Sequence, residues 1–183
     1  MMLSGCPLDP QETVLKGDTD GVGYHIKLVL DGVPFTAERV QNEVSTLLAD
    51  INAKFSKQRE DSEISRINAQ ETTDWLPVSR EVAQFVNIAH SVYEHSDGCY
   101  DLTASPLLAL WDAARKQNRV PSQEEIDTLL PHTGMPLLEV DTVSQSIRKK
   151  DPKLKIDVSP IAQAYSAGLV ARRTMTKSFS TIN

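Results

Sequence analysis

The sequence predicts an α+β protein in which an antiparallel sheet is covered by several helices. A few short segments alternate apolar and polar residues, which indicates strands. Longer segments repeat apolar residues every three or four positions and follow a serine or threonine, which indicates capped helices. The expected order is strands, helices, strands and a final helix. It lacks the regular alternation of strand and helix that builds a parallel sheet.

The first strands are expected near the N-terminus, after an unstructured lead-in over residues 1–12. Residues 22–30 alternate in the manner of a half-buried strand, and residues 13–17 are suited to be its antiparallel partner. The connection, "GDTDGVG" (17–23), is rich in glycine. Such a loop can approach a phosphate, but its two aspartates would repel one, so a plain turn is favoured.

The helices are expected to begin at residues whose side chains or rings suit a helix N-terminus. Ser122 and Glu125 have the spacing of a capping box, and the final helix is expected over 160–177. The predicted starts are Thr36, Asp61 or Ser62, Ser79, Ser105 with Pro106, Ser122, and Ser159 with Pro160.

Three further strands are predicted over 136–141, 145–150 and 154–159. No linker rich in proline, glycine or serine divides the chain. We therefore expect one domain over residues 13–183.

Composition and charge narrow the classes of partner. Of the 183 residues, 40% are hydrophobic and 24% charged, which is ordinary for a folded domain, and the formal net charge is −6. This charge indicates neither nucleic-acid binding nor attraction to an anionic membrane surface. "LSGC" ends at Cys6 and has the small residues of a bacterial lipoprotein cleavage site. Cys6 is then a lipid-bearing residue in one interpretation and an ordinary cysteine near a flexible end in the other.

Two acidic residues have positions that suit a ligand site. Asp101 lies in "GCYDLTASPLLALW" (98–111), between a glycine that ends one helix and the start of the next, and Asp157 lies just before the last helix. Anionic ligands and hydrated cations bind at such loops and helix N-termini. The two acids either share a pocket or have the commoner roles of helix cap and strand-edge residue. Cys99 is expected to be a small buried residue.

Several segments occur together in one order along the chain. They are "DINAKFSKQREDSEISRIN" (50–68), "VSREVAQFVNIAH" (78–90), "DGCYDLTASPLLALW" (97–111), "PSQEEIDTLL" (121–130) and "IDVSPIAQAYSAG" (156–168). Over about residues 13–175 the chain resembles the N-terminal half of the FAD:protein FMN transferases, the ApbE family. The resemblance implies a periplasmic, lipid-anchored, magnesium-dependent enzyme. Such an enzyme cleaves FAD, attaches FMN to a threonine of an acceptor protein and releases AMP.

The resemblance also implies which residues form the site. Cys99, Tyr100 and Asp101 would line the flavin nucleotide, Asp157 matches a family aspartate, and the backbone carbonyl of Pro160 would be a magnesium ligand. Other flavin-site positions carry different residues here: Asp20 in place of methionine, Gln58 in place of tyrosine, and Gln163 in place of lysine or glutamate.

These replacements change the expected chemistry. A carboxylate at Asp20 disfavours an apolar contact and repels a pyrophosphate, and Gln58 offers no aromatic face. The family's C-terminal half has no counterpart in these residues, so we expect a shortened or degenerate flavin transferase. The alternative is a non-catalytic periplasmic lipoprotein that binds a protein partner, with or without flavin. An exposed sheet edge would favour pairing with a second copy.

Overall fold

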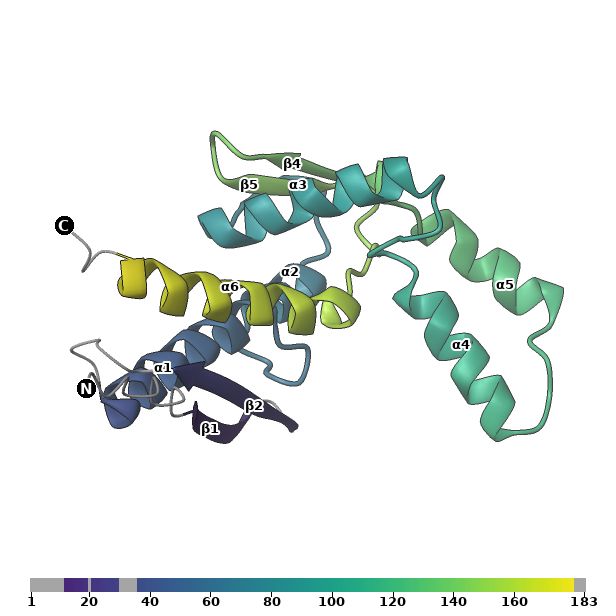
Figure 1. The fold of residues 1–183 in the computed structure, drawn as a ribbon. Coiled ribbons are helices and arrows are strands. Elements are labelled where there is room, and N and C mark those ends of the chain that lie inside the picture. Colours follow the sequence, from purple (N-terminus) through teal and green to yellow (C-terminus); the bar gives the residue numbers. More distant parts are fainter. Residues whose placement is uncertain (1–11, 20, 30–35, 180–183) are drawn as a thin grey trace, which may run out of the picture. The chain divides into compact units, whose positions relative to one another are not determined.

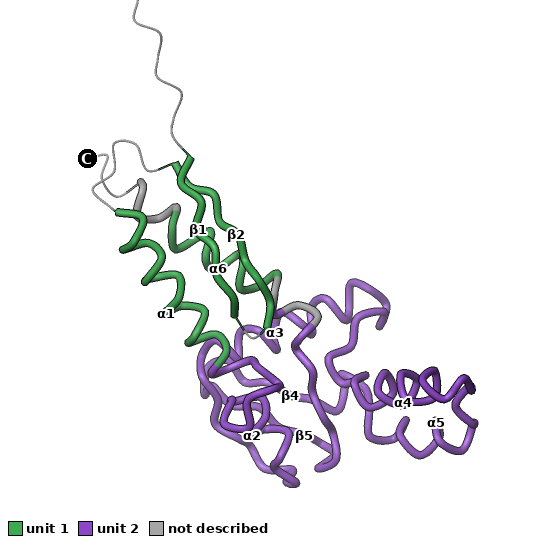
Figure 2. The backbone as a smooth tube through the Cα atoms, turned by 90° about the horizontal axis from the view of Figure 1, so that it is seen from below, with its two compact units in different colours: residues 1–52, 163–183 green, residues 53–162 purple. Residues whose placement is uncertain are grey.

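The structure is a computed structural model that describes residues 12–19, 21–29 and 36–179 (Figure 1), without the side chains of 160, 161, 163 and 175–179. The chain divides into two compact units (Figure 2). One comprises Met1–Asn52 with Gln163–Asn183, and the other Ala53–Ala162. The single domain expected over residues 13–183 stays a prediction.

The first unit contains the predicted hairpin and the first long helix. Strands β1 (Glu12–Thr19) and β2 (Val22–Val29) are antiparallel, as the sequence predicts. Helix α1 (Ala37–Phe55) begins where Thr36 accepts a hydrogen bond from the amide of Arg39 at 3.2 Å, so the predicted cap is confirmed. The side chain of Asn52 donates to Thr19 at 2.8 Å and thereby ties α1 to the hairpin.

The second unit contains an antiparallel sheet in the strand order β3-β5-β4. Its strands are β3 (Trp75–Pro77), β4 (Leu138–Asp141) and β5 (Ser146–Lys149). Its helices are α2 (Glu63–Ala69), α3 (Arg80–His95), α4 (Ser105–Lys116) and α5 (Gln123–Leu129), with 3-10 turns η1 (Leu130–His132) and η2 (Met135–Leu137). Residues exposed by 1% or less include Ile64, Val82, Leu102, Met135, Ile147 and Leu154, and they form its core.

Helix α6 (Ser159–Phe179) follows the last loop and is the predicted final helix. No helix among the described residues is both long enough and apolar enough to span a membrane. The α+β class is confirmed, with the described strands divided between two small antiparallel sheets.

Most predicted helix starts are confirmed, but α4 and α6 each begin one residue earlier than predicted, at Ser105 and Ser159. The hydroxyls of Ser62, Ser79 and Ser122 each accept an amide hydrogen bond at the start of a helix. At α4 the cap is Ala104 instead of Ser105. Ala104 already has a helical backbone (φ −72°, ψ −5°), so the hydroxyl of Ser105 lies inside the first turn.

The predicted strand over 154–159 is wrong. Its apolar alternation is real, since Leu154, Ile156 and Val158 are buried. However, the side chain of Asn68 accepts from the amide of Ile156 and donates to its carbonyl, both at 2.8 Å. These backbone groups therefore have a side-chain partner in place of a neighbouring strand.

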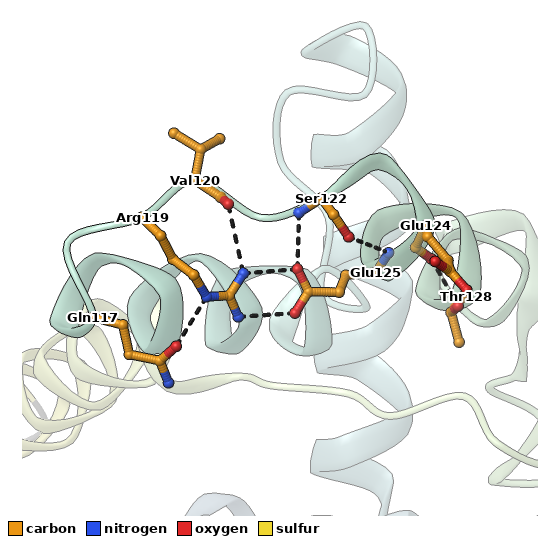
Figure 3. Close-up of polar contacts among 7 residues, drawn as sticks. All are labelled: Gln117, Arg119, Val120, Ser122, Glu124, Glu125 and Thr128. Atoms are coloured by element: carbon orange, nitrogen blue, oxygen red, sulfur yellow. Dashed lines mark hydrogen bonds and ion pairs between the residues drawn. The ribbon is translucent and has the colours of Figure 1, made fainter.

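The turn between α4 and α5 is held by one carboxylate (Figure 3). The guanidinium of Arg119 donates to both oxygens of Glu125, at 2.7 and 2.8 Å. Glu125 also accepts from the amide of Ser122 at 2.8 Å, and the hydroxyl of Ser122 accepts from the amide of Glu125 at 3.2 Å. The predicted capping box is therefore present, with an arginine clamp added to it.

This clamp makes a pH-dependent contribution to stability. The hydrogen bonds from Arg119, and then that from the Ser122 amide, lower the pKa of Glu125 from 4.5 to about 2. Because the folded-state pKa is depressed, the stabilisation is present above the unfolded pKa and is lost as the pH falls toward 2. We expect a carboxyl NMR titration midpoint of Glu125 near 2 that rises in R119Q but not in R115Q, whose arginine bonds to Asp112. A wild-type midpoint near 4.5 would contradict the clamp.

Candidate functional site

The loop between α3 and α4 carries three of the predicted site residues. Asp97 and Gly98 have positive φ angles of 51° and 79°, which reverse the chain after α3. The amide of Gly98 donates to the carbonyl of Tyr93 at 2.9 Å, and that of Tyr100 donates to the hydroxyl of Ser96 at 3.1 Å. The end of α3 thus fixes the path of residues 99–103.

Asp101 fastens this loop to the segment before β4. One carboxylate oxygen accepts from the amide and the hydroxyl of Thr103, at 2.7 and 2.6 Å, and the other accepts from the amide of Met135 at 3.1 Å. The fully buried hydroxyl of Thr103 accepts in turn from the amide of Gly134 at 2.5 Å. As a loop clamp, Asp101 therefore joins the loop after α3 to the first residue of η2, and it does not cap α4, whose cap is Ala104.

Asp157 lies beside this clamp. Its amide donates to the carbonyl of Leu102 at 2.8 Å. One of its carboxylate oxygens accepts from the amide of Ser159 at 2.9 Å, and the other pairs with the ammonium of Lys57 at 3.1 Å. Burial alone would raise the pKa of Asp157, but the hydrogen bonds from Ser159 and Lys57 outweigh it and lower that pKa. Asp157 is therefore a carboxylate at neutral pH.

Tyr100 lies within the electrostatic reach of both acids. Burial, and then the negative charges of Asp157 and Asp101, raise the pKa of its phenol to about 12. The hydroxyl oxygen is shielded from solvent and has no hydrogen-bond partner among the described residues. A buried hydroxyl without a partner is costly, so this group is suited to donate to a bound polar ligand.

The remaining predicted site residues are either exposed or lie, wholly or by their side chains, outside the described residues. Cys99 is exposed, so the expectation of a buried thiol is wrong; it lies in the turn that follows Gly98, outside the core. Gln58 is exposed in the loop between α1 and α2. Gln163 and Pro160 belong to α6, but their side chains lie outside the described residues. Asp20 and Cys6 lie outside the described residues altogether. The predicted roles of these residues stay predictions.

Lys57 is the site residue that sequence reasoning missed. Its ammonium reaches Asp157 across 100 positions of the chain, and no local pattern signals such a pairing. The sequence does indicate Lys57 in one respect, because it directly precedes Gln58, a predicted flavin-site residue.

A magnesium ion does not fit the described side chains by themselves. Among them no group of three or more His, Cys, Asp or Glu residues is arranged to hold a metal ion. The carboxylate of Asp101 already accepts three hydrogen bonds, and that of Asp157 is paired with Lys57. Two donors are available to an anionic organic ligand: the Tyr100 hydroxyl and the Lys57 ammonium, each of which lies near Asp157.

The fold and the site define an α+β protein in which Asp101 and Asp157, from two neighbouring loops, lie near the phenol of Tyr100. The sequence matches the ApbE family over residues 21–182, and the chain belongs to that family. Among similar proteins, the FAD:protein FMN transferase of Vibrio cholerae is 29% identical over 93% of this chain and 51% of its own length. That of Escherichia coli K12 is 30% identical over 92% and 51%, respectively.

Solved structures give the same assignment of fold. The flavin transferase ApbE from Vibrio cholerae has a TM-score of 0.84 at 28% identity, covering 92% of this chain and 54% of that one. The apo flavinyl transferase ApbE of Pseudomonas stutzeri has a TM-score of 0.81 at 30% identity, covering 91% and 53%. The chain spans about half the length of the curated relatives it matches.

Proposed function

We propose that the protein binds FAD and takes part in the transfer of FMN from FAD to an acceptor protein. The observation that carries this proposal is the solvent-shielded hydroxyl of Tyr100, which has no hydrogen-bond partner among the described residues and lies near enough to Asp157 and Asp101 for their charges to raise its pKa. Similar proteins named FAD:protein FMN transferase, which match more than nine-tenths of this chain, support it.

The residues of the site have distinct roles in this proposal. In the transfer, a hydroxyl oxygen of the acceptor bonds to the phosphorus of the flavin phosphate and gives its proton to solvent. The bond from that phosphorus to the oxygen bridging the two phosphates breaks, so that AMP leaves with the bridging oxygen and FMN is joined to the acceptor by a phosphodiester. Catalysis of such a step depends mainly on positioning and on electrostatic stabilisation. Asp101 holds the loop between α3 and α4 in place, and Asp157 bonds to the first residue of α6. The Tyr100 hydroxyl donates to a polar atom of the nucleotide.

The finer features implied by the family are part of the same proposal. The acceptor group is a threonine hydroxyl, and the protein lies in the periplasm, anchored to a bacterial membrane by lipid on Cys6. Magnesium would neutralise phosphate charge in the reaction. The Pro160 carbonyl would then need partners beyond Asp101 and Asp157, because the donors described above already engage those two carboxylates.

A second candidate is a non-catalytic relative that binds a protein partner. The observation that favours it is the complete internal pairing of both acids at the site. Within the described residues β1 and β2 pair only with each other, and an unpaired strand edge is a surface on which a second copy can add. For the non-catalytic candidate we propose a homodimer that forms through an edge of the β1–β2 sheet.

Transfer to a protein acceptor distinguishes the two candidates. The purified chain is mixed with FAD, magnesium and an acceptor that bears the target threonine, and the acceptor is analysed by mass spectrometry. We expect a mass gain of one FMN, with none on the same acceptor after its threonine is changed to valine. FAD binding without any mass gain would favour the non-catalytic candidate. Absence of both would overturn the flavin function.

A further inference from the structure

In the described part of the chain, Lys57 contributes the cation that pairs with Asp157, one of the two acids of the site. Its ammonium lies 3.1 Å from Asp157, whose side chain is 20% exposed, while the lysine side chain is 56% exposed. The lysine therefore approaches the carboxylate from the solvent side. Within the described residues, Asp157 is its only hydrogen-bond partner.

This arrangement leaves donor capacity at the site. An ammonium carries three N–H groups, and one is sufficient for the bond to Asp157. The others are directed at no described residue and are available to a ligand. Lysine is a compact cation that binds phosphate as a point charge, and such bonds are charge-assisted.

The charges at the site make this lysine important for any anionic ligand. Asp101 and Asp157 both carry negative charge that a phosphate would meet on approach. Three donors from the surrounding loops offset the charge of Asp101. The charge of Asp157 is offset by one amide and by Lys57. Within the described residues, the Lys57 ammonium is therefore the exposed positive charge next to Asp157.

We propose that Lys57 is a phosphate-binding residue of this site, whose ammonium bridges Asp157 and a phosphate oxygen of the ligand. The ammonium then supplies the positive charge between the Asp157 carboxylate and the phosphate. Binding of a pyrophosphate-containing ligand consequently does not need a divalent cation. The inference rests on the proposed function for the identity of the ligand, FAD, but the pairing itself concerns only the anion.

Isothermal titration calorimetry of the full chain tests the inference with two probes, inorganic pyrophosphate and FAD. Each is titrated in EDTA and again with magnesium, against wild type, K57Q and K57R. Lys150 pairs with Glu139 at 3.0 Å and is 47% exposed, so K150Q is a matched control. In EDTA we expect K57Q to weaken binding of both probes at least about tenfold, while K57R and K150Q stay within about threefold of wild type.

The outcomes separate this inference from the proposed function. Equal binding of FAD by wild type and K57Q would overturn the role of Lys57 and leave the flavin function standing. Binding of pyrophosphate that depends on Lys57, without binding of FAD, would support the role and overturn the flavin function. No binding of either probe in EDTA would overturn the cation-independent site. Thermal unfolding of the free variants checks their folding, since a half-exposed ion pair contributes little to stability.

Discussion

Replacing Asp101 with alanine is expected to lower the free energy of unfolding by about 2–4 kcal/mol. The carboxylate accepts three hydrogen bonds, two from Thr103 and one from the amide of Met135. Thr103 is fully buried, so its amide and hydroxyl lose an acceptor where water does not replace it. Urea unfolding followed by circular dichroism measures the loss.

Two further variants make this result specific. In D101N one oxygen still accepts from Thr103, but the amide nitrogen faces the N–H of Met135, so we expect a smaller loss than in D101A. Asp112 is exposed and bonds to Arg115, so D112A is the control and is expected to change stability by less than about 1 kcal/mol. A D101A protein as stable as wild type would show that the clamp does not hold the loops together.

Replacing Asn68 with alanine is expected to lower the free energy of unfolding by about 2–3 kcal/mol. The side chain of Asn68 bonds to both backbone groups of Ile156, which is 2% exposed. Without it, a buried N–H and a buried carbonyl are left without partners. Because Ile156 directly precedes Asp157, we also expect FAD binding to weaken in N68A.

The control for this variant is N87A. Asn87 is an exposed residue of α3, and replacing it is expected to change stability by less than about 0.5 kcal/mol. Chemical denaturation gives the stabilities, and calorimetry with FAD gives the affinities. Unchanged stability in N68A would contradict the assigned role of Asn68, whereas lost stability with unchanged FAD affinity would separate Asn68 from the binding site.

The parts of the fold that were predictable depend on local chemistry. A serine that caps its own helix, such as Ser79 or Ser122, acts within three residues, and the capping box is visible as a spacing. The segment 154–159 was predicted as a strand because its apolar and polar residues alternate. Its actual partner is Asn68, 88 positions away, and a single amide side chain has no pattern that predicts such a contact.

The candidate site was predictable in its acids but not in their roles. The position of Asp101 between a glycine and a helix start suggested either a cap or a ligand contact. It does not cap α4, because its carboxylate bonds to Thr103 and to the amide of Met135, 34 positions away, and its role as a ligand contact stays a prediction. Asp157 lies close to Asp101 because its amide donates a hydrogen bond to the carbonyl of Leu102. Its ion pair with Lys57 involves a third segment of the chain. Only the tertiary structure brings these together.

We propose that FAD binds beside Tyr100, Asp101 and Asp157. An FAD titration followed by ¹H–¹⁵N NMR tests it most directly, because the amides of Thr103, Met135 and Ser159 each donate to one of the two carboxylates. We expect the largest chemical-shift changes at these three amides and at Tyr100. Saturable binding that leaves all four signals in place, or no binding at all, would contradict the claim.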